Sequence, residues 1–170
     1  MTLQPRLLTL CGLLAAFMLS ACGTEPAMME WFDGKKGGCS DFFIYRFNPQ
    51  ETEAITLSAT GDSLDLSTTP TTFTLPYRFL SLRIDRFELP SSHFYCNDIA
   101  GTGKRLMQWS AESGRVTITA TAPDMSRPVW DRPYEVSVTI EDATLKSQTG
   151  ETITVDEFDF GTITVGWMPG

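Results

Sequence analysis

Apolar and polar residues alternate along much of this 170-residue chain, and this alternation is the feature that most limits its possible folds. Val116, Ile118 and Ala120 are separated by threonines, and the same pattern continues through residues 134–141. Neighbouring side chains of a β-strand point to opposite faces of the sheet, so a period of two indicates strands with one covered and one solvated face. After the leading 22 residues, no long stretch keeps the apolar period of an amphipathic helix. The sequence therefore predicts an all-β domain.

The number and spacing of the alternating stretches indicate the architecture. They predict about eight to ten short strands, separated by turns rich in glycine, proline and serine. We expect a two-sheet antiparallel sandwich, Ig-like or jelly-roll-like, with a closed barrel as the alternative. The sandwich is favoured because the loop 122–133 carries three prolines and would suit a crossover between two sheets.

Two stretches depart from simple alternation. Residues 42–47 are apolar or aromatic at nearly every position, which predicts a strand covered on both faces. Farther along, the apolar parity changes between Ile84 and Phe87, which predicts a β-bulge near Asp85 and Arg86.

The first 22 residues have the pattern of an export signal. Arg6 and the terminal amine give a positively charged start, and residues 7–19 form an uncharged apolar run. This run is too short for a bilayer core of about 30 Å, which needs roughly 20 helical residues, but it fits the apolar region of a signal peptide. The run ends in the tetrapeptide Leu19-Ser20-Ala21-Cys22.

This tetrapeptide resembles the lipobox of bacterial lipoproteins, in which an aliphatic and two small residues precede a cysteine. The resemblance implies that the signal peptide 1–21 is removed and that the thiol of Cys22 is acylated, so that lipid chains such as palmitate anchor the protein to a membrane. In many Gram-negative bacteria, an aspartate after this cysteine retains a lipoprotein at the inner membrane. Gly23 therefore implies the outer membrane of the cell envelope, on its periplasmic side or at the surface. The remaining chain is similar in architecture to small all-β lipoproteins of unknown function.

The chain after the signal divides into a tether and one domain. Residues 22–38 are expected to be the lipidated cysteine and a flexible, glycine-rich tether, and residues 39–170 a single β-sandwich domain. Trp31 and Phe32 are the exception within the tether, because their bulky side chains are expected to tuck into the domain.

Two of the four cysteines remain once the leader and the acylation site are set aside. An exported protein meets an oxidising compartment, so Cys39 and Cys96 are predicted to form a disulfide bond. A metal site at these cysteines lacks further ligands, since the chain has one histidine, His93, and no Cys-x-x-Cys motif.

The charge balance limits the partners. The chain has 13 Lys and Arg against 21 Asp and Glu, a formal net charge of −8, and removal of the leader takes away Arg6 but no acid. Nucleic acids reward basic surfaces, so no nucleic-acid partner is expected.

Few residues suggest chemistry. His93 has no neighbouring serine and acid in the order of a known triad, and no catalytic residue is predicted. Asp156, Glu157 and Asp159 could hold calcium or act as a glycosidase pair, yet they match no established loop motif and also suit a solvated strand. No metal and no cofactor are therefore expected.

The strongest binding candidate is the loop that contains Trp130, flanked by Arg127 and Arg132. Loops carry much of the recognition in β folds, and aromatic faces stack on sugars and anchor protein interfaces. We expect a non-enzymatic binding domain for an envelope protein or a glycan. One alternative is an inhibitor of a secreted hydrolase such as a lysozyme, since periplasmic lysozyme inhibitors are also small, disulfide-bonded β lipoproteins. A glycan hydrolase is the weaker alternative.

Overall fold

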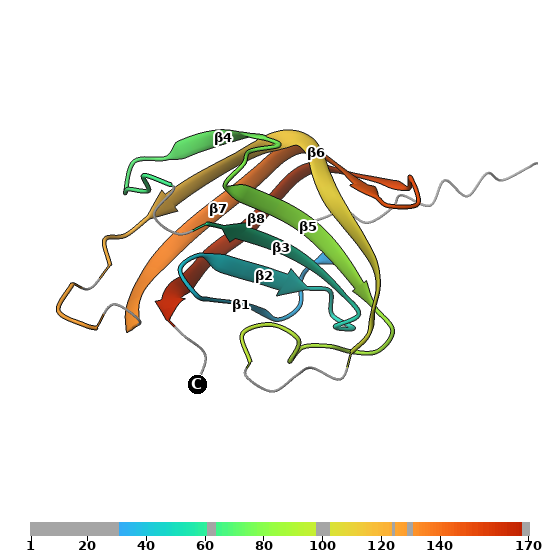
Figure 1. Ribbon diagram of the computed structural model, residues 1–170, viewed down its shortest axis with the longest axis horizontal. Coiled ribbons are helices and arrows are strands. Elements are labelled where there is room, and N and C mark those ends of the chain that lie inside the picture. Colours follow the sequence, from blue (N-terminus) through green and yellow to red (C-terminus); the bar gives the residue numbers. More distant parts are fainter. Residues whose placement is uncertain (1–30, 61–63, 98–102, 124, 129–130, 168–170) are drawn as a thin grey trace, which may run out of the picture.

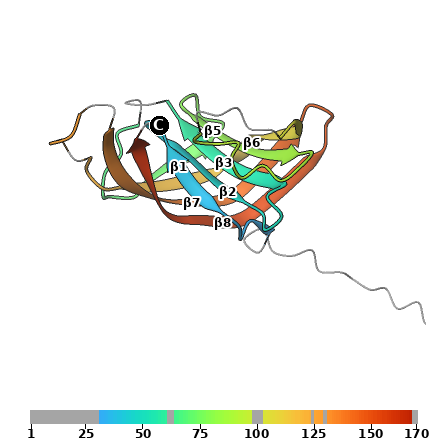
Figure 2. The ribbon, with the colours of Figure 1, turned by 90° about the horizontal axis from the view of Figure 1, so that it is seen from below.

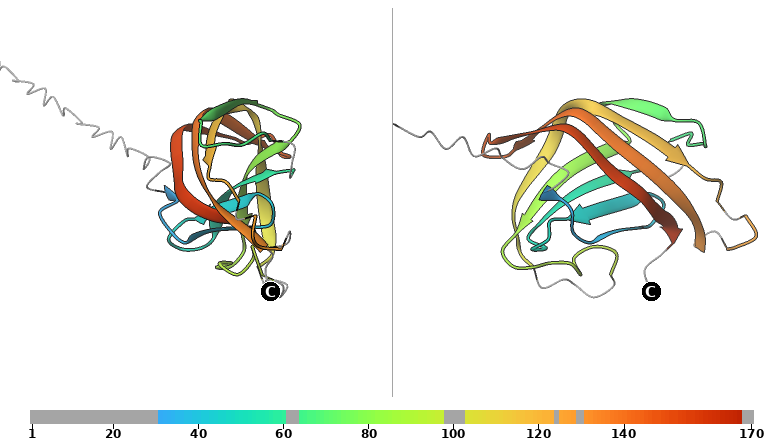
Figure 3. Two further views of the ribbon diagram at one scale, coloured as in Figure 1. Left: turned by 90° about the vertical axis from the view of Figure 1, so that its left-hand side faces the viewer. Right: turned by 180° about the vertical axis from the view of Figure 1, so that it is seen from behind.

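The computed structural model describes residues 31–60, 64–97, 103–123, 125–128 and 131–167. Its strands form one antiparallel sheet in the order β1-β2-β3-β5-β6-β7-β8, and β4 pairs with β6 beside this path. The sheet curls until it is nearly closed and barrel-like (Figures 1, 2 and 3). The strands are β1 (Lys36–Cys39), β2 (Phe43–Phe47), β3 (Glu53–Ala59), β4 (Thr71–Leu75), β5 (Leu80–Phe87), β6 (Arg105–Ala120), β7 (Asp131–Ser147) and β8 (Thr152–Trp167).

The all-β prediction is confirmed, and the single curled sheet corresponds to the barrel alternative. The expected crossover in the loop before β7 is wrong, because β6 and β7 are hydrogen-bonded antiparallel neighbours joined by that loop. Pro123 follows the end of β6 and Pro133 lies in the first residues of β7, and neither carries information on where the next strand goes. Three strands are also longer than expected, at 16 or 17 residues.

The long strands bend at residues with positive φ. In the sequence, the change of apolar pattern at these positions resembles the end of a strand. Gly114 in β6 has a φ of +133°, and a Cβ there would lie 2.7 Å from the Cβ of Ala143 in β7. Asp142 in β7 and Gly161 in β8 also have positive φ, at 50° and 67°. Such β-bulges reverse the inward and outward parity and increase the local bend. Each strand can therefore run from one end of the barrel to the other while keeping its apolar side chains inside.

The barrel interior is filled by side chains. Phe32 is buried against Phe158 in an edge-to-face contact with ring centroids 5.9 Å apart, which confirms the prediction for Phe32. The same prediction is wrong for Trp31, whose side chain stays exposed. The sheet also begins before Cys39, so Lys36–Gly38 at the end of the expected tether belong to β1. The largest interior side chains that are fully buried are Phe32, Trp109, Phe158, Phe160, Ile44, Ile55, Leu57, Leu82, Ile84, Ile118 and Ile140.

The barrel closes incompletely between β1 and β8. Its two edge strands meet in a bridge between Ser40 and Trp167, where the amide of Ser40 donates to the carbonyl of Trp167 at 2.8 Å. Farther along the seam, the Lys36 ammonium donates to the carbonyl of Phe160 at 3.4 Å. A side chain thus bonds to a strand carbonyl at the incompletely closed seam.

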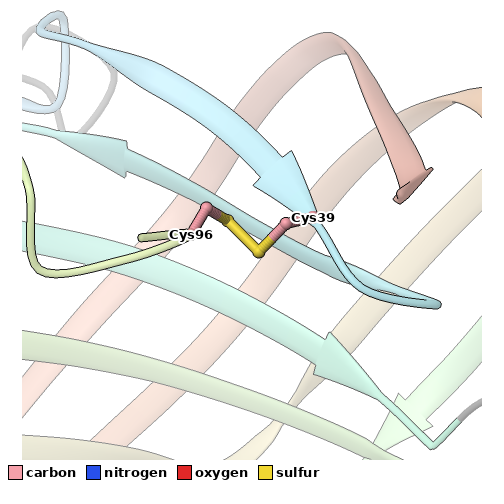
Figure 4. The surroundings of a disulfide bond; sticks show 2 residues. All are labelled: Cys39 and Cys96. Carbon is pink, nitrogen blue, oxygen red and sulfur yellow. A yellow bond between two sulfur atoms is a disulfide. The ribbon is translucent and has the colours of Figure 1, made fainter. Parts of the chain in front are cut away.

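A segment that we call the strap, residues 88–97, covers the outer face of β2, β3 and β5. Cys96 in the strap is bonded to Cys39 at the end of β1, which confirms the predicted disulfide (Figure 4). Beneath the strap lies a second cluster that makes β2 covered on both faces, as predicted. It consists of Tyr45, Phe47, Ala54 and Phe87, with Phe43, Phe94, Tyr95 and Cys96 packed against them.

The strap also explains the parity change in β5. Phe87 is buried on the outer face, under the strap, whereas Leu82 and Ile84 face the interior. A register shift does occur in the pairing with β6, between Arg86 and Phe87, one residue beyond the predicted position. The pairing of β5 with β3 stays regular through this region. The apolar pattern of β5 changes parity mainly because the strap covers the outer face at Phe87, whereas the interior is the covered face at Leu82 and Ile84.

Candidate functional site

The candidate site is a hollow on the outer face of the barrel, which we call the groove. It has a volume of about 270 Å³ and is lined by Thr68, Thr119, Ala120, Thr121, Glu135, Ser137 and Thr162. The outer face of a barrel is convex, so a hollow there needs a raised wall. The amide of Ala120 donates to the carbonyl of Ser67 at 2.8 Å, which holds the segment before β4 against the end of β6.

The groove owes its polar lining to strand alternation. Thr119, Ser137 and Thr162 lie side by side in register across β6, β7 and β8, all on the outward face. The hydroxyls of Ser137 and Thr162 are hydrogen-bonded at 3.1 Å. Thr121 Oγ1 accepts from the amide of Glu135 at 2.9 Å, which leaves its own proton free to donate.

The loop that the sequence predicts as a ligand-binding loop begins and ends beside the groove. Thr121 and Glu135 are paired at its base, where the amide of Thr121 donates to the carbonyl of Glu135 at 2.9 Å. Both predicted arginines are engaged within the loop. Arg127 forms an ion pair with Asp131, and Arg132 Nε donates to the carbonyl of Arg127 at 3.0 Å. Trp130, the aromatic candidate of this loop, lies outside the residues that the structure describes.

The first described residue lies at the other end of the barrel. Trp31 Nε1 donates to Glu53 at 2.7 Å, and the other oxygen of this carboxylate accepts from Arg86 Nε at 2.5 Å. The Arg86 guanidinium stacks over Trp109, which pairs with β7 at Ser147. These contacts place Trp31 toward the end of the barrel with the β7–β8 turn, whereas the groove lies at the end with the β6–β7 loop. Figure 1 shows this turn and this loop at opposite ends of the strands.

Asp85 is a buried carboxylate that the sequence did not single out. Its side chain is 3% exposed and accepts hydrogen bonds from Tyr95 at 2.5 Å, Gln108 at 2.8 Å and Arg105 at 3.2 Å. Burial raises the pKa of Tyr95 strongly, and the negative Asp85 raises it further. Tyr95 belongs to the strap and Gln108 and Arg105 belong to β6, so Asp85 ties the strap to the sheet, and we assign this carboxylate to stability. Its sequence signal is an acid between Arg83 and Arg86 on an alternating strand.

The remaining candidates do not assemble into a site. His93 is an exposed strap residue whose carbonyl accepts from Asn97 at 3.5 Å. Asp156 and Glu157 are exposed on β8, whereas Asp159 accepts from the amide of Gly161 at 2.7 Å. In the part of the chain that the structure describes, no three His, Cys, Asp or Glu side chains are grouped to hold a metal ion.

Known proteins give no further guide to this site. Within the described ranges, no helix has both the length and the apolar character needed to cross a membrane. Comparison with protein-family models, with curated protein sequences and with solved structures found no match for this chain. Its function must therefore be argued from its own residues.

Proposed function

We propose that the chain is a lipid-anchored lipoprotein of the cell envelope, placed at the outer membrane, that works as a non-enzymatic binding domain. It holds a glycan or protein ligand in the groove and against the adjoining loop of residues 127–132. The anchor is supported by the lipobox-like sequence that ends in Cys22, and Gly23 supports the outer membrane.

The observation that carries the binding proposal is the polar groove at the base of the loop. Five hydroxyls and one carboxylate line it. Hydroxyls donate and accept hydrogen bonds, so they match the alternating donors and acceptors of a sugar or of a polypeptide backbone. The volume of about 270 Å³ is near the lower end of ordinary ligand sites, which favours a ligand the size of one or two sugar rings.

The position of the groove also suits an anchored binder. The nine chain steps from Cys22 to Trp31 reach at most about 30 Å, so the lipid holds the barrel by its Trp31 end. The groove lies near the opposite end of β6, away from this point of attachment. A ligand can then approach it without meeting the membrane.

A second candidate function, inhibition of a basic secreted hydrolase, is supported by the acidic outer face of β7 and β8. Glu141 and Glu157 are directly opposed in register, and Asp142 and Asp156 are exposed beside them. Arg115 of β6 forms ion pairs with Glu141 and Asp142, so these four acids share one arginine and the face stays acidic. An acidic face of this kind attracts a basic enzyme and speeds its association.

The binding proposal is tested by capture of envelope components with the full-length acylated protein as bait. Thr119→Val removes a groove hydroxyl while keeping the shape of the side chain, and Trp130→Ala removes the aromatic candidate. Thr154→Val is the matched control, because Thr154 is an exposed threonine on β8 outside the groove lining. We expect the wild type and the control to retain a component that both test variants lose. Equal recovery of every component by all four proteins would overturn the proposal.

The same experiment separates the second function. A basic hydrolase recovered by the bait, and inhibited by it in an activity assay, would favour inhibition. Loss of this recovery in Glu141→Gln or Glu157→Gln, but not in Thr119→Val, would place the contact on the acidic face.

A further inference from the structure

We propose that the ligand of the groove is a polyol that carries a positive charge, such as an amino sugar with a free ammonium group. This inference rests on the proposed binding function and names the chemistry that the groove selects. Among the described residues that line the groove, Glu135 carries the only charged side chain, and the other polar side chains are hydroxyls.

The groove contains a hydrogen-bond acceptor, the carboxylate of Glu135, for which the described residues supply no donor. The carboxylate of Glu135 has no hydrogen-bond or ion-pair partner among the residues that the structure describes, and the side chain is exposed. A carboxylate can only accept hydrogen bonds, whereas the five hydroxyls can donate or accept. A ligand that supplies extra donors completes this set. An ammonium group brings three donors and a charge opposite to that of Glu135.

The basic residues nearest in sequence do not supply this charge. Arg127 is paired with Asp131, and Arg132 donates to the carbonyl of Arg127, so both guanidinium groups are used within the loop. The formal net charge of −8 adds a long-range attraction for cations. An anionic ligand would meet Glu135, and the lining residues that the structure describes include no cation to compensate.

The hydroxyl row favours a polyol over a simple cation. Thr119, Ser137 and Thr162 stand on three neighbouring strands, which lie about 4.8 Å apart. The three strand backbones therefore span roughly 10 Å under the groove, and the hydroxyls of Ser137 and Thr162 are drawn together at 3.1 Å. This polar row presents several hydroxyls to one ligand, as the hydroxyls of a sugar require. A bare ammonium ion would use Glu135 and leave this row unused.

The test is calorimetric titration of the full-length acylated protein in detergent micelles at low ionic strength. The probes are a tetramer of glucosamine, which carries free ammonium groups, and the neutral tetramer of N-acetylglucosamine. We expect the charged tetramer to bind at least tenfold more tightly, a difference of about 1.4 kcal/mol. Glu135→Gln should abolish this preference. Glu151→Gln, which removes an exposed acid at the β7–β8 turn, should keep it.

Each outcome separates the ligand class from the binding function. Equal affinity for both tetramers, or a preference that survives in Glu135→Gln, would overturn the charged-ligand inference. If both tetramers then lose affinity in Thr119→Val, the groove is still a binding site for neutral glycans. If neither tetramer binds while envelope capture still depends on Thr119, the inference is wrong and the binding function stands. If neither tetramer binds and capture does not depend on the groove, both are wrong.

Discussion

The hydroxyl of Tyr95 donates a 2.5 Å hydrogen bond to the buried carboxylate of Asp85, and this bond joins the strap to the barrel. The next residue, Cys96, is bonded to Cys39. Two adjacent residues of the strap therefore connect it to the barrel, one by a hydrogen bond and one by a disulfide bond. Together they keep the second aromatic cluster covered.

Replacement of Asp85 by asparagine should destabilise the domain by about 2–3 kcal/mol, because Gln108 and Arg105 would face an amide that also donates. The measurement is chemical denaturation followed by tryptophan fluorescence. Asp156→Asn, the same change at an exposed position, should alter the free energy of unfolding by less than about 0.5 kcal/mol. Similar effects for the two variants would contradict the role given to Asp85.

Stability should fall as the pH rises above about 10. Burial and the negative Asp85 raise the pKa of Tyr95, so the folded protein keeps a proton that the unfolded chain releases with a pKa near 10.0. The unfolded state then binds fewer protons, and the free energy of unfolding decreases by up to about 1.4 kcal/mol per pH unit for this group. Denaturation at pH 9, 10 and 11 measures the slope. Tyr95→Phe should be less stable at pH 9 but should show a shallower slope, and an unchanged slope would refute the assignment.

Loss of the disulfide should weaken the fold without removing it. The double variant Cys39→Ala, Cys96→Ala opens a cross-link between residues 57 apart, which the chain-entropy model values at about 4 kcal/mol. Protease cleavage within residues 88–97 should become faster, because only the contacts around Asp85 and the buried rings then hold the strap. Intact mass spectrometry of the wild type tests whether the disulfide forms. Free thiols at both Cys39 and Cys96 in the mature protein would contradict the bond.

Gly114→Ala should cost about 2–4 kcal/mol. The φ of +133° disfavours any residue with a Cβ, and the added methyl would lie 2.7 Å from the Cβ of Ala143. Gly150→Ala is the matched control, since its φ is +91° but no atom lies within 4 Å of the added Cβ. It should cost about 1 kcal/mol from backbone strain alone. Equal thermal unfolding midpoints for the two variants would show that the β6–β7 contact at the bulge is unimportant.

The lipid anchor is tested at Cys22. Cys22→Ser should accumulate as an uncleaved, unacylated precursor, because acylation needs the sulfur nucleophile. Radiolabelled palmitate and membrane fractionation measure the two effects, with Cys11→Ser as the control inside the leader. Normal acylation and normal membrane partition of Cys22→Ser would refute the anchor.

Much of the strand content was predictable from local pattern. The alternation at Val116, Ile118 and Ala120 identified the buried face of β6, and the doubly covered stretch 42–47 was recognised as β2 and its flank. The bends were harder to predict. Asp142, an ordinary residue with φ of 50°, lies in the middle of a continuous strand, where the change of parity resembles a strand end.

The groove was not predictable, because its parts have no distinctive sequence. Thr119 and Thr162 are ordinary outward residues of alternating strands, separated by more than 40 positions along the chain. They become neighbours of Ser137 only through the register of three strands. The loop beside the groove could be chosen from its composition as a binding candidate, but the ion pair of Arg127 with Asp131 depends on its folded conformation.

By itself the sequence determined the all-β class, the covered faces of most strands and the pairing of Cys39 with Cys96. These follow from local periodicity and from the number of available thiols, which need no knowledge of distant contacts. Only the tertiary structure decided that the strands form one nearly closed sheet, that the strap covers its outer face and that hydroxyls of three strands meet beside Glu135. The physical reason is that strand order and register arise from long-range hydrogen bonding and packing, which the same alternating pattern can satisfy in several topologies.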